Sequence, residues 1–343
     1  MLRALARRDR ALLAGIAAYR RHPFRRELPD PPVIWQEGGS RLLDFSTGPP
    51  MRNGPVPAVL FVPSLVNRAY VLDLLPGGSL LRFLAARGLR PLLLDWGWPG
   101  EAERRFTLTD YVSGRLERAL DAATVAAGGP VVLAGYCMGG LLALAAALRR
   151  PEQVRALALL ATPWDFWAGN EADHARALAG MLPALEPMLE AAGTLPVDAI
   201  QMLFAGLDPF AVAEKFRAFA RLDQAGPRAR LFVALEDWLH DGVPLAAPVA
   251  RECLAGWYGA NTPGRGEWHV AGLAVDPAGW KGPAFLAIPA RDRIVPPASA
   301  EALAALLPGA VAHRPAAGHI GMVAGSGAEG ALWLPFLRWI EGA

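Results

Sequence analysis

The chain has 343 residues, of which 53% are hydrophobic and 19% charged, a composition that excludes a disordered protein. The formal net charge of +2 gives no reason to expect a nucleic acid as partner. No run of about 18 or more apolar residues indicates a membrane span. The two cysteines imply no disulfide framework, so we expect a reduced, cytoplasmic setting.

The N-terminal stretch MLRALARRDRALLAGIAAYRRHPFRR contains eight arginines and a single acidic residue, Asp9. Its apolar part is short and is followed at once by arginines, which argues against a signal peptide. The spacing predicts a basic amphipathic helix that ends at the proline-rich ELPDPP, so residues 1–32 form a helix and a linker. Two roles remain open: a solvated helix packed on the edge of the domain, or a docking surface for a partner or an apolar particle.

Short apolar strands alternating with helical segments follow the linker. VIWQEGGSRLLDF predicts two strands around a Gly-Gly turn, and PAVLFVPSL, RPLLLDWG, VVLAG and RALALLAT each predict a buried strand. TLTDYVSGRLERALDAATVAAGG predicts a helix before VVLAG. Wholly apolar strands alternating with helices indicate an α/β protein whose mostly parallel sheet is covered by helices on both faces.

The strand rhythm stops between residues 163 and 270, where Trp, Met, Leu and Phe are frequent but buried β-runs are lacking. We interpret this segment as a mainly helical cap, or lid. The alternation resumes at GPAFLAIPARD and at AVAHRPAAGH, and ALWLPFLRWIEG predicts a closing helix. Residues 33–162 and 271–343 therefore form the predicted core around the insertion.

The stretch AGYCMGG, residues 134 to 140, lies between a predicted strand and the helical pattern LLALAAALRR. Its frame, G-x-nucleophile-x-G, is typical of the sharp turn that exposes one side chain in an α/β-hydrolase fold. That position usually holds serine, and here it holds Cys137. The pattern predicts an α/β-hydrolase with a cysteine nucleophile.

A nucleophile at this turn needs a histidine base, and in this fold the chain order is nucleophile, acid, histidine. Of the six histidines, only His313 and His319 follow the last strand signals. His313 lies within the strand pattern and is interpreted as structural, whereas His319 follows it in AAGHIG. Asp292, in ARDRIVPP, follows the preceding strand at the same carboxyl edge of the sheet. We therefore predict Cys137 as nucleophile, His319 as base and Asp292 as the supporting acid.

Asp95, at the end of LLLDWG, is an alternative acid, but its place before the nucleophile makes it the weaker choice. Cys253, in RECLAGWYG, is interpreted as a buried small hydrophobic residue. The histidines and acids lack the spacing of metal ligands, so we predict neither a metal ion nor another cofactor.

A thiol at the elbow has a chemical rationale. The N-terminus of the following helix and the nearby His319 both favour the thiolate form of Cys137. A thiolate exchanges acyl groups with a carrier thiol at little energetic cost, which favours transfer from a donor such as acyl-CoA over hydrolysis. The oxyanion formed in each step needs two backbone N–H donors, which we assign to Met138 and to Leu65 or Val66.

Several motifs in one order resemble the polyhydroxyalkanoate synthase family, closest to its short class. They are VPSLVNRAYVLDLL, LLLDWGWP, GYCMGG, DWLHDGVP, ARDRIVPP and GHI. The resemblance implies the thioester-forming nucleophile at Cys137, the general base at His319 and the carboxylate at Asp292. It also places Trp238 and Asp241 in the cap, where they are candidates for the substrate channel.

The chain departs from the family pattern at some positions. Arg293 follows the aspartate where the family often has histidine, and Ser64 replaces the second proline of N-P-P. GMVAGSG follows the histidine in place of the common asparagine-proline-proline. These changes leave the three predicted catalytic residues in place and concern the channel around them.

The resemblance implies an acyltransferase that polymerises (R)-3-hydroxyacyl-CoA with release of CoA. It also implies cytoplasmic polymer granules as the place of action, and a homodimer or a second synthase subunit as partner. Two alternatives remain open. One is a cysteine hydrolase of the same fold, namely a thioesterase, an esterase or an intracellular depolymerase. The other is a non-catalytic granule-binding or partner subunit, against which the complete set of three residues argues.

Overall fold

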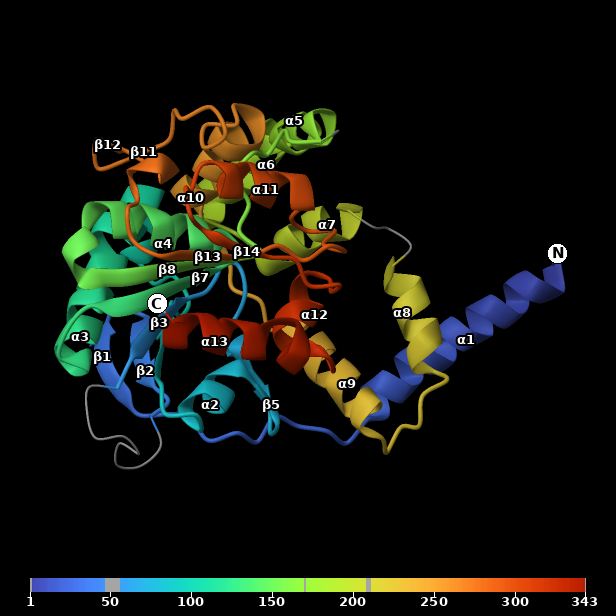
Figure 1. The fold of residues 1–343 in the computed structure, drawn as a ribbon. Coiled ribbons are helices and arrows are strands. Elements are labelled where there is room, and N and C mark those ends of the chain that lie inside the picture. The colour runs from blue at the N-terminus through green and yellow to red at the C-terminus, as the bar shows by residue number, and fades with distance from the viewer. Residues whose placement is uncertain (1, 47–55, 170, 208–210, 343) are drawn as a thin grey trace.

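An eight-stranded sheet forms the centre of the molecule (Figure 1). The computed structural model describes residues 2–46, 56–169, 171–207 and 211–342. The strand order is β1-β2-β6-β3-β7-β8-β13-β14, and the six strands from β6 to β14 run parallel. Strand β2 is antiparallel to both of its neighbours, β1 and β6. The strands are β1 (Val33–Glu37), β2 (Ser40–Asp44), β3 (Ala58–Val62), β6 (Arg90–Asp95), β7 (Val131–Tyr136), β8 (Val154–Leu160), β13 (Ala284–Ala287) and β14 (Val311–His313).

Both faces of the sheet are buried, which explains why the central strands are apolar at successive positions. In β3, Leu60 and Val62 belong to one hydrophobic cluster, while Val59 and Phe61 belong to the cluster on the opposite face. The helices α3, α4 and α11 contribute to the first cluster, and α2, α12 and α13 contribute to the second. The predicted α/β-hydrolase architecture, a mostly parallel sheet with helices on both faces, is therefore confirmed.

The helices that cover the sheet come from the connections between its strands and from the segment after the last strand, β14. Two of these helices follow π-helical segments directly: η3 (Asp110–Leu116) precedes α3 and η7 (Glu329–Trp333) precedes α13. The covering helices are α2 (Leu80–Ala85), α3 (Glu117–Ala127), α4 (Met138–Arg149), α11 (Pro297–Ala305), α12 (His319–Ala324) and α13 (Leu334–Gly342). Short elements also occur at η1 (Ala69–Leu72), β4 (Asp73–Leu75), β5 (Gly78–Ser79), η2 (Glu103–Arg105), η4 (Pro151–Gln153) and η6 (Pro277–Gly279).

A long, mainly helical insertion lies between β8 and β13. It also contains two pairs of two-residue strands, β9 with β10 and β11 with β12, which are too short to produce a visible alternation in the sequence. Its elements are α5 (Ala172–Ala179), α6 (Leu182–Ala192), β9 (Thr194–Leu195), α7 (Val197–Leu207), α8 (Ala211–Phe219), α9 (Pro227–His240), β10 (Leu245–Ala246), α10 (Ala247–Arg251), the π-helical η5 (Glu252–Gly259), β11 (His269–Val270) and β12 (Leu273–Ala274). The boundaries 163 and 270 of the cap stay a prediction.

The N-terminal helix α1 (Leu2–Arg21) lies beside α8, and both extend away from the sheet in Figure 1. The Tyr19 hydroxyl donates a hydrogen bond of 2.7 Å to Asp237 of α9, and the Tyr19 ring contacts Phe216 of α8 edge-on. A Cβ at Gly15 would collide with the backbone of Phe216, so the two helices touch at this point. The helix is thus packed on the edge of the insertion, while its role as a docking surface stays a prediction.

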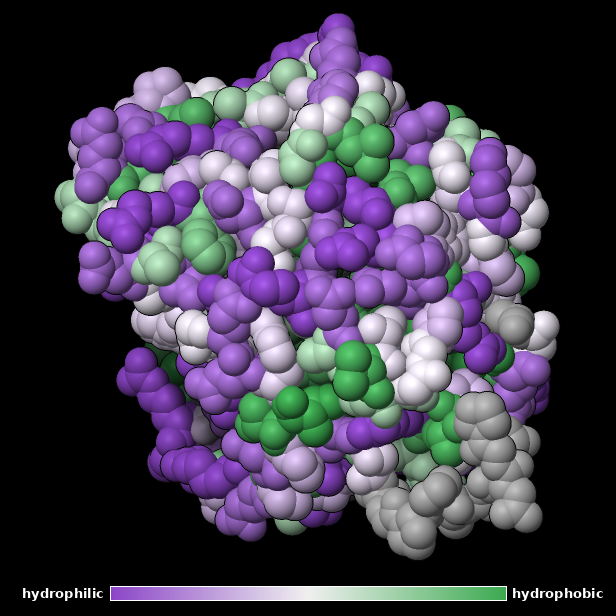
Figure 2. Space-filling view, turned by 90° about the vertical axis from the view of Figure 1, so that its left-hand side faces the viewer, coloured by the Kyte–Doolittle hydropathy of each residue, from purple (hydrophilic) through white to green (hydrophobic). Residues whose placement is uncertain are grey.

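One face of the molecule is mostly hydrophilic. Figure 2 shows the face that carries α3 and β1, where hydrophilic residues dominate and hydrophobic ones form small separate areas. Within the described ranges, no helix combines the length and apolarity needed to cross a membrane.

Candidate active site

Cys137 occupies a sharp turn between β7 and α4. Its φ of 55° and ψ of −129° lie in a region that side-chain-bearing residues rarely adopt. The turn is held by the Cys137 amide, which donates to the carbonyl of Leu160 (2.8 Å). Two glycines make room for it, because a Cβ at Gly135 would collide with Gly140 and a Cβ at Gly139 with the carbonyl of Val62. The G-x-C-x-G frame therefore folds as predicted, as a tight elbow that presents one side chain.

His319 and Asp292 form a buried pair next to this elbow. The Nδ1 atom of His319 lies 2.7 Å from Oδ2 of Asp292. The other carboxylate oxygen accepts hydrogen bonds from the amides of Ile294 (2.8 Å) and Val295 (2.9 Å). These bonds hold the carboxylate in one orientation, and the carboxylate in turn orients the imidazole. His319 is the first residue of α12, so the start of a helix presents the ring.

The ionisation of His319 is set by two opposing effects. Burial alone would lower the pKa of the ring, but the neighbouring Cys137 and the hydrogen bond that the ring donates to Asp292 raise this pKa from 6.5 to about 10. The hydrogen bond between His319 and Cys137 contributes to the increase. The His319 ring therefore keeps its proton at neutral pH and places a cation beside the sulfur of Cys137.

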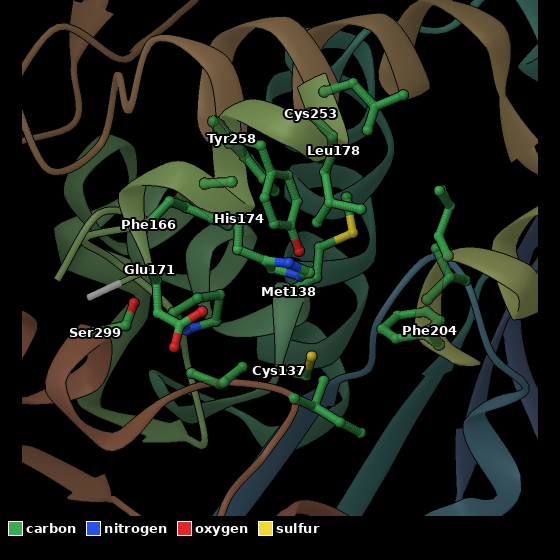
Figure 3. Close-up of a pocket in the computed structure, with 18 of the residues that line it drawn as sticks. Cys137, Met138, Phe166, Glu171, His174, Leu178, Phe204, Cys253, Tyr258 and Ser299 are labelled. Atoms are coloured by element: carbon green, nitrogen blue, oxygen red, sulfur yellow. The ribbon is translucent and has the colours of Figure 1, made fainter. Parts of the chain in front are cut away.

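Two pockets meet at Cys137. The larger one, about 640 Å³, lies under the insertion and is lined mostly by apolar side chains (Figure 3). The smaller one, about 60 Å³, includes His319, Trp238 and Arg68. Since Cys137 lines both, a group bound to its sulfur is accessible from two sides.

The predicted oxyanion donors lie on the two segments that meet at the elbow. Met138 is the first residue of α4, where amide groups have no partner within the helix. Leu65 and Val66 follow β3, and the amide of Val66 is 3.3 Å from the hydroxyl of Ser64. Met138 and Val66 line the larger pocket together with Cys137, whereas Leu65 is buried in the hydrophobic core.

Trp238 and Asp241 connect the insertion to the segment after β3. The indole N–H of Trp238 donates to the carbonyl of Arg68 at 2.8 Å. Asp241 accepts hydrogen bonds from the Arg68 guanidinium (3.3 Å) and the Tyr70 hydroxyl (3.2 Å). Both residues thus join the insertion to this segment, and Trp238 also lines the smaller pocket.

The remaining candidates have other partners. Asp95 accepts a hydrogen bond of 2.7 Å from Arg41 of the neighbouring strand β2. Cys253 is buried on η5, and burial raises the pKa of its thiol. His313 ends β14, and its Nε2 lies 2.6 Å from the carbonyl of Ala331. Within the described ranges, no three His, Cys, Asp or Glu side chains converge as a metal site requires.

The larger pocket also contains two polar residues that no sequence motif identified. His174 of α5 lines it, and its Nε2 is buried without a hydrogen-bond partner in the described structure. Tyr258 of η5 lines it as well, and burial together with Cys137 and Cys253 raises the pKa of its hydroxyl. Neither belongs to a motif, so only the fold identifies them.

A nucleophile elbow at β7, with a histidine and an aspartate beyond β14 and β13 on this sheet, defines the α/β-hydrolase class. The model of the alpha/beta hydrolase fold family matches residues 57–325. The structure is similar to that of the Paleococcus ferrophilus monoacylglycerol lipase, with a TM-score of 0.54 and 16% sequence identity. The match covers 88% of this chain and 98% of the lipase chain, and it shows the fold alone.

Two relatives identify a family within this class. The chain is 31% identical to the poly(3-hydroxyalkanoate) polymerase subunit PhaC of Synechocystis sp. over 80% of its own length and 74% of that protein. It is 28% identical to the protein of the same name from Haloferax mediterranei over 90% of its own length, but spans only 63% of that protein. The chain belongs to the poly(3-hydroxyalkanoate) polymerase family.

Proposed function

We propose that the chain is an acyltransferase that polymerises (R)-3-hydroxyacyl-CoA into polyhydroxyalkanoate and releases CoA, through a thioester on Cys137. The observation that carries the proposal is the hydrogen-bonded series Cys137, His319 and Asp292 at the junction of two pockets. Its membership of the poly(3-hydroxyalkanoate) polymerase family points to the same chemistry.

In the first step the Cys137 thiolate attacks the thioester carbonyl. The C–S bond to CoA breaks, and the departing CoA thiolate takes the proton from the His319 imidazolium, which leaves an acyl–cysteine and a neutral imidazole. The negative charge on the carbonyl oxygen is stabilised by the amides of Met138 and of Leu65 or Val66.

In the second step the neutral His319 accepts the proton of an incoming hydroxyl, carried by another 3-hydroxyacyl unit. The alkoxide attacks the acyl–cysteine, an ester bond forms and the thiolate leaves, which restores the thiolate–imidazolium pair. Asp292 stabilises the imidazolium throughout. We propose residues 163–270 as the cap that keeps water from the acyl–cysteine, since hydrolysis would otherwise compete.

We extend the proposal to the surroundings of the enzyme. The names of the two relatives describe polymerase subunits, and we propose that this chain likewise acts in an assembly, as a homodimer or with a second subunit. The granule surface is its proposed place of action, and α1 is the segment we assign to docking there.

The test is incubation of the purified chain with (R)-3-hydroxybutyryl-CoA and with longer homologues. We expect CoA release after a lag, a cloudy solution and a thioester mass adduct on Cys137. Steady CoA release that yields only free 3-hydroxy acid would make water the acceptor and the chain a hydrolase. If the chain bound granules without releasing CoA from any homologue, a non-catalytic subunit would replace the proposal.

A further inference from the structure

The larger pocket is much bigger than a short acyl group requires. A 3-hydroxybutyryl group has six non-hydrogen atoms, which would fill about 180 Å³ if each took the ~30 Å³ of a water molecule in the liquid. The pocket holds about 640 Å³. More than two thirds of it would stay empty around a four-carbon acyl group on Cys137.

Most of the surplus space is lined by hydrocarbon. Residues from six elements of the insertion line it, among them Leu178, Ile200, Leu203, Leu245, Leu254 and Trp257. Some of the polar side chains that line it already have partners. Asp165 accepts a hydrogen bond from the amide of Trp167 (2.8 Å), and Ser299 accepts one from the amide of Trp164 (3.0 Å). A cavity lined mostly by hydrocarbon gains affinity mainly from a ligand with hydrocarbon to bury, and the unpartnered Nε2 of His174 offers one polar contact.

The pocket has a direction. Figure 3 shows Cys137 on one side of the pocket, Leu178 of α5 and Tyr258 and Cys253 of η5 on the opposite side, and His174 and Met138 between them. An acyl chain attached to Cys137 would therefore extend towards Leu178 and Cys253.

We infer that the larger pocket is an acyl chamber for 3-hydroxyacyl groups longer than 3-hydroxybutyryl, with Leu178 limiting the chain length at its far end. The inference rests on the proposed function and adds the substrate class to it. Each additional methylene buried in the chamber is expected to favour acylation about fourfold, until the chain reaches the far wall.

The experiment compares single-turnover acylation of Cys137 by 3-hydroxybutyryl-, 3-hydroxyhexanoyl-, 3-hydroxyoctanoyl- and 3-hydroxydecanoyl-CoA. Released CoA and the mass adduct are both measured. We expect kcat/KM for the octanoyl thioester to exceed that for the butyryl thioester at least about tenfold, because ordering the longer chain offsets part of the methylene gain. This series uses the unmodified protein and needs no variant to fold.

A pair of variants on α5 tests the position of the far wall. Leu178→Trp reduces the length of the chamber and should lower octanoyl transfer about tenfold while butyryl transfer stays within about twofold. Ala177→Trp places the same side chain on the exposed side of α5 and should leave both rates unchanged. A loss that is equal for all chain lengths in Leu178→Trp would overturn the assignment of Leu178.

The outcomes separate the two levels of the proposal. Faster acylation by the butyryl thioester than by the octanoyl thioester would overturn the acyl chamber and leave the proposed function intact. Failure of every thioester to acylate Cys137 would overturn both.

Discussion

The two cysteines of this chain lie in two regions with opposite surroundings, although both line the same pocket. Cys137 stands at the strand–helix elbow of the core, in a strained backbone conformation and within hydrogen-bond reach of His319. Cys253 lies in the π-helical η5 of the insertion, where burial and the nearby Glu252 raise the pKa of its thiol. The core region provides a cation for a thiolate, whereas the insertion favours the neutral thiol.

This contrast shows that the reactivity of a thiol depends on its position in the fold. An elbow brings together a helix N-terminus, a histidine and a free approach for the acyl carbon, which no single helical turn provides. The insertion contributes shape and hydrocarbon instead. This contrast predicts that substitutions in the core change the reaction rate for every substrate, whereas substitutions in the insertion change which substrate is preferred.

The largest expected effect follows from removing each cysteine in turn. Cys137→Ala should lower acyl transfer by at least about ten-thousand-fold, because the attacking atom is lost. Cys253→Ala is the matched control and should keep most of the activity. The measurement is CoA release together with the mass of the protein after incubation with acyl-CoA. An adduct on Cys253, or full activity of Cys137→Ala, would contradict the contrast.

The next effect concerns the partners of Cys137. His319→Ala should lower transfer by about a hundred- to ten-thousand-fold, because proton transfer at both steps is lost. Asp292→Asn should cost less, on the order of a hundredfold, since a thiolate–imidazolium pair persists without its carboxylate. Asp95→Asn breaks only the pair with Arg41 and serves as control. A harmless Asp292→Asn beside a crippling Asp95→Asn would reverse the assignment of the acid.

A smaller effect is a shift in pH dependence. The pKa of His319 is raised from 6.5 to about 10, so the imidazolium persists at neutral pH and is lost as the pH rises through about 10. The raised pKa means that protonated His319 contributes fully to the stability of the fold below pH 6.5. This contribution is lost as the pH rises through about 10. Asp292→Asn removes one cause of the raised pKa, so the alkaline limb of kcat/KM should move to lower pH. An unmoved limb would show that Asp292 does not act on His319.

The smallest effect concerns the contact between insertion and core. Trp238→Phe removes the N–H that donates to the Arg68 carbonyl and should destabilise the protein by about 1 kcal/mol, measured by thermal unfolding. It should also reduce acyl transfer a few-fold, because the anchored segment carries Leu65 and Val66. Trp280→Phe removes a comparable N–H bond to Pro283, away from both pockets, and should affect stability alone. Equal losses of transfer in the two variants would argue against the anchoring role.

Local sequence signals predicted the sheet, and they also selected the residues that the structure brings together around Cys137, whose catalytic roles stay a prediction. The elbow is recognisable within seven residues, because it needs glycines at positions where a Cβ would collide with neighbouring atoms. Buried parallel strands are recognisable from their continuous apolar runs. Chain order alone selected Asp292 over Asp95, and the structure pairs Asp292 with His319 and Asp95 with Arg41.

Non-local features could not be predicted in the same way. His174 and Tyr258 reach the pocket from α5 and η5, whose common position depends on how the insertion folds over the core. The contact of Trp238 joins residues 170 positions apart. Two-residue strands end before an alternation of buried and exposed residues is completed, and no sequence pattern in this chain separates a π-helical segment from an α-helix.

The positions around the elbow differ in the substitutions that they tolerate. A side chain at Gly135, Gly139 or Gly140 would meet backbone or the side chain of Thr162, so each is bound to its place by its neighbours. The side chain of Cys137 points into open space between the pockets, so an exchange for serine leaves those contacts untouched. A single substitution at position 137 can therefore exchange a thiol for a hydroxyl nucleophile during evolution, without passing through a variant that fails to fold.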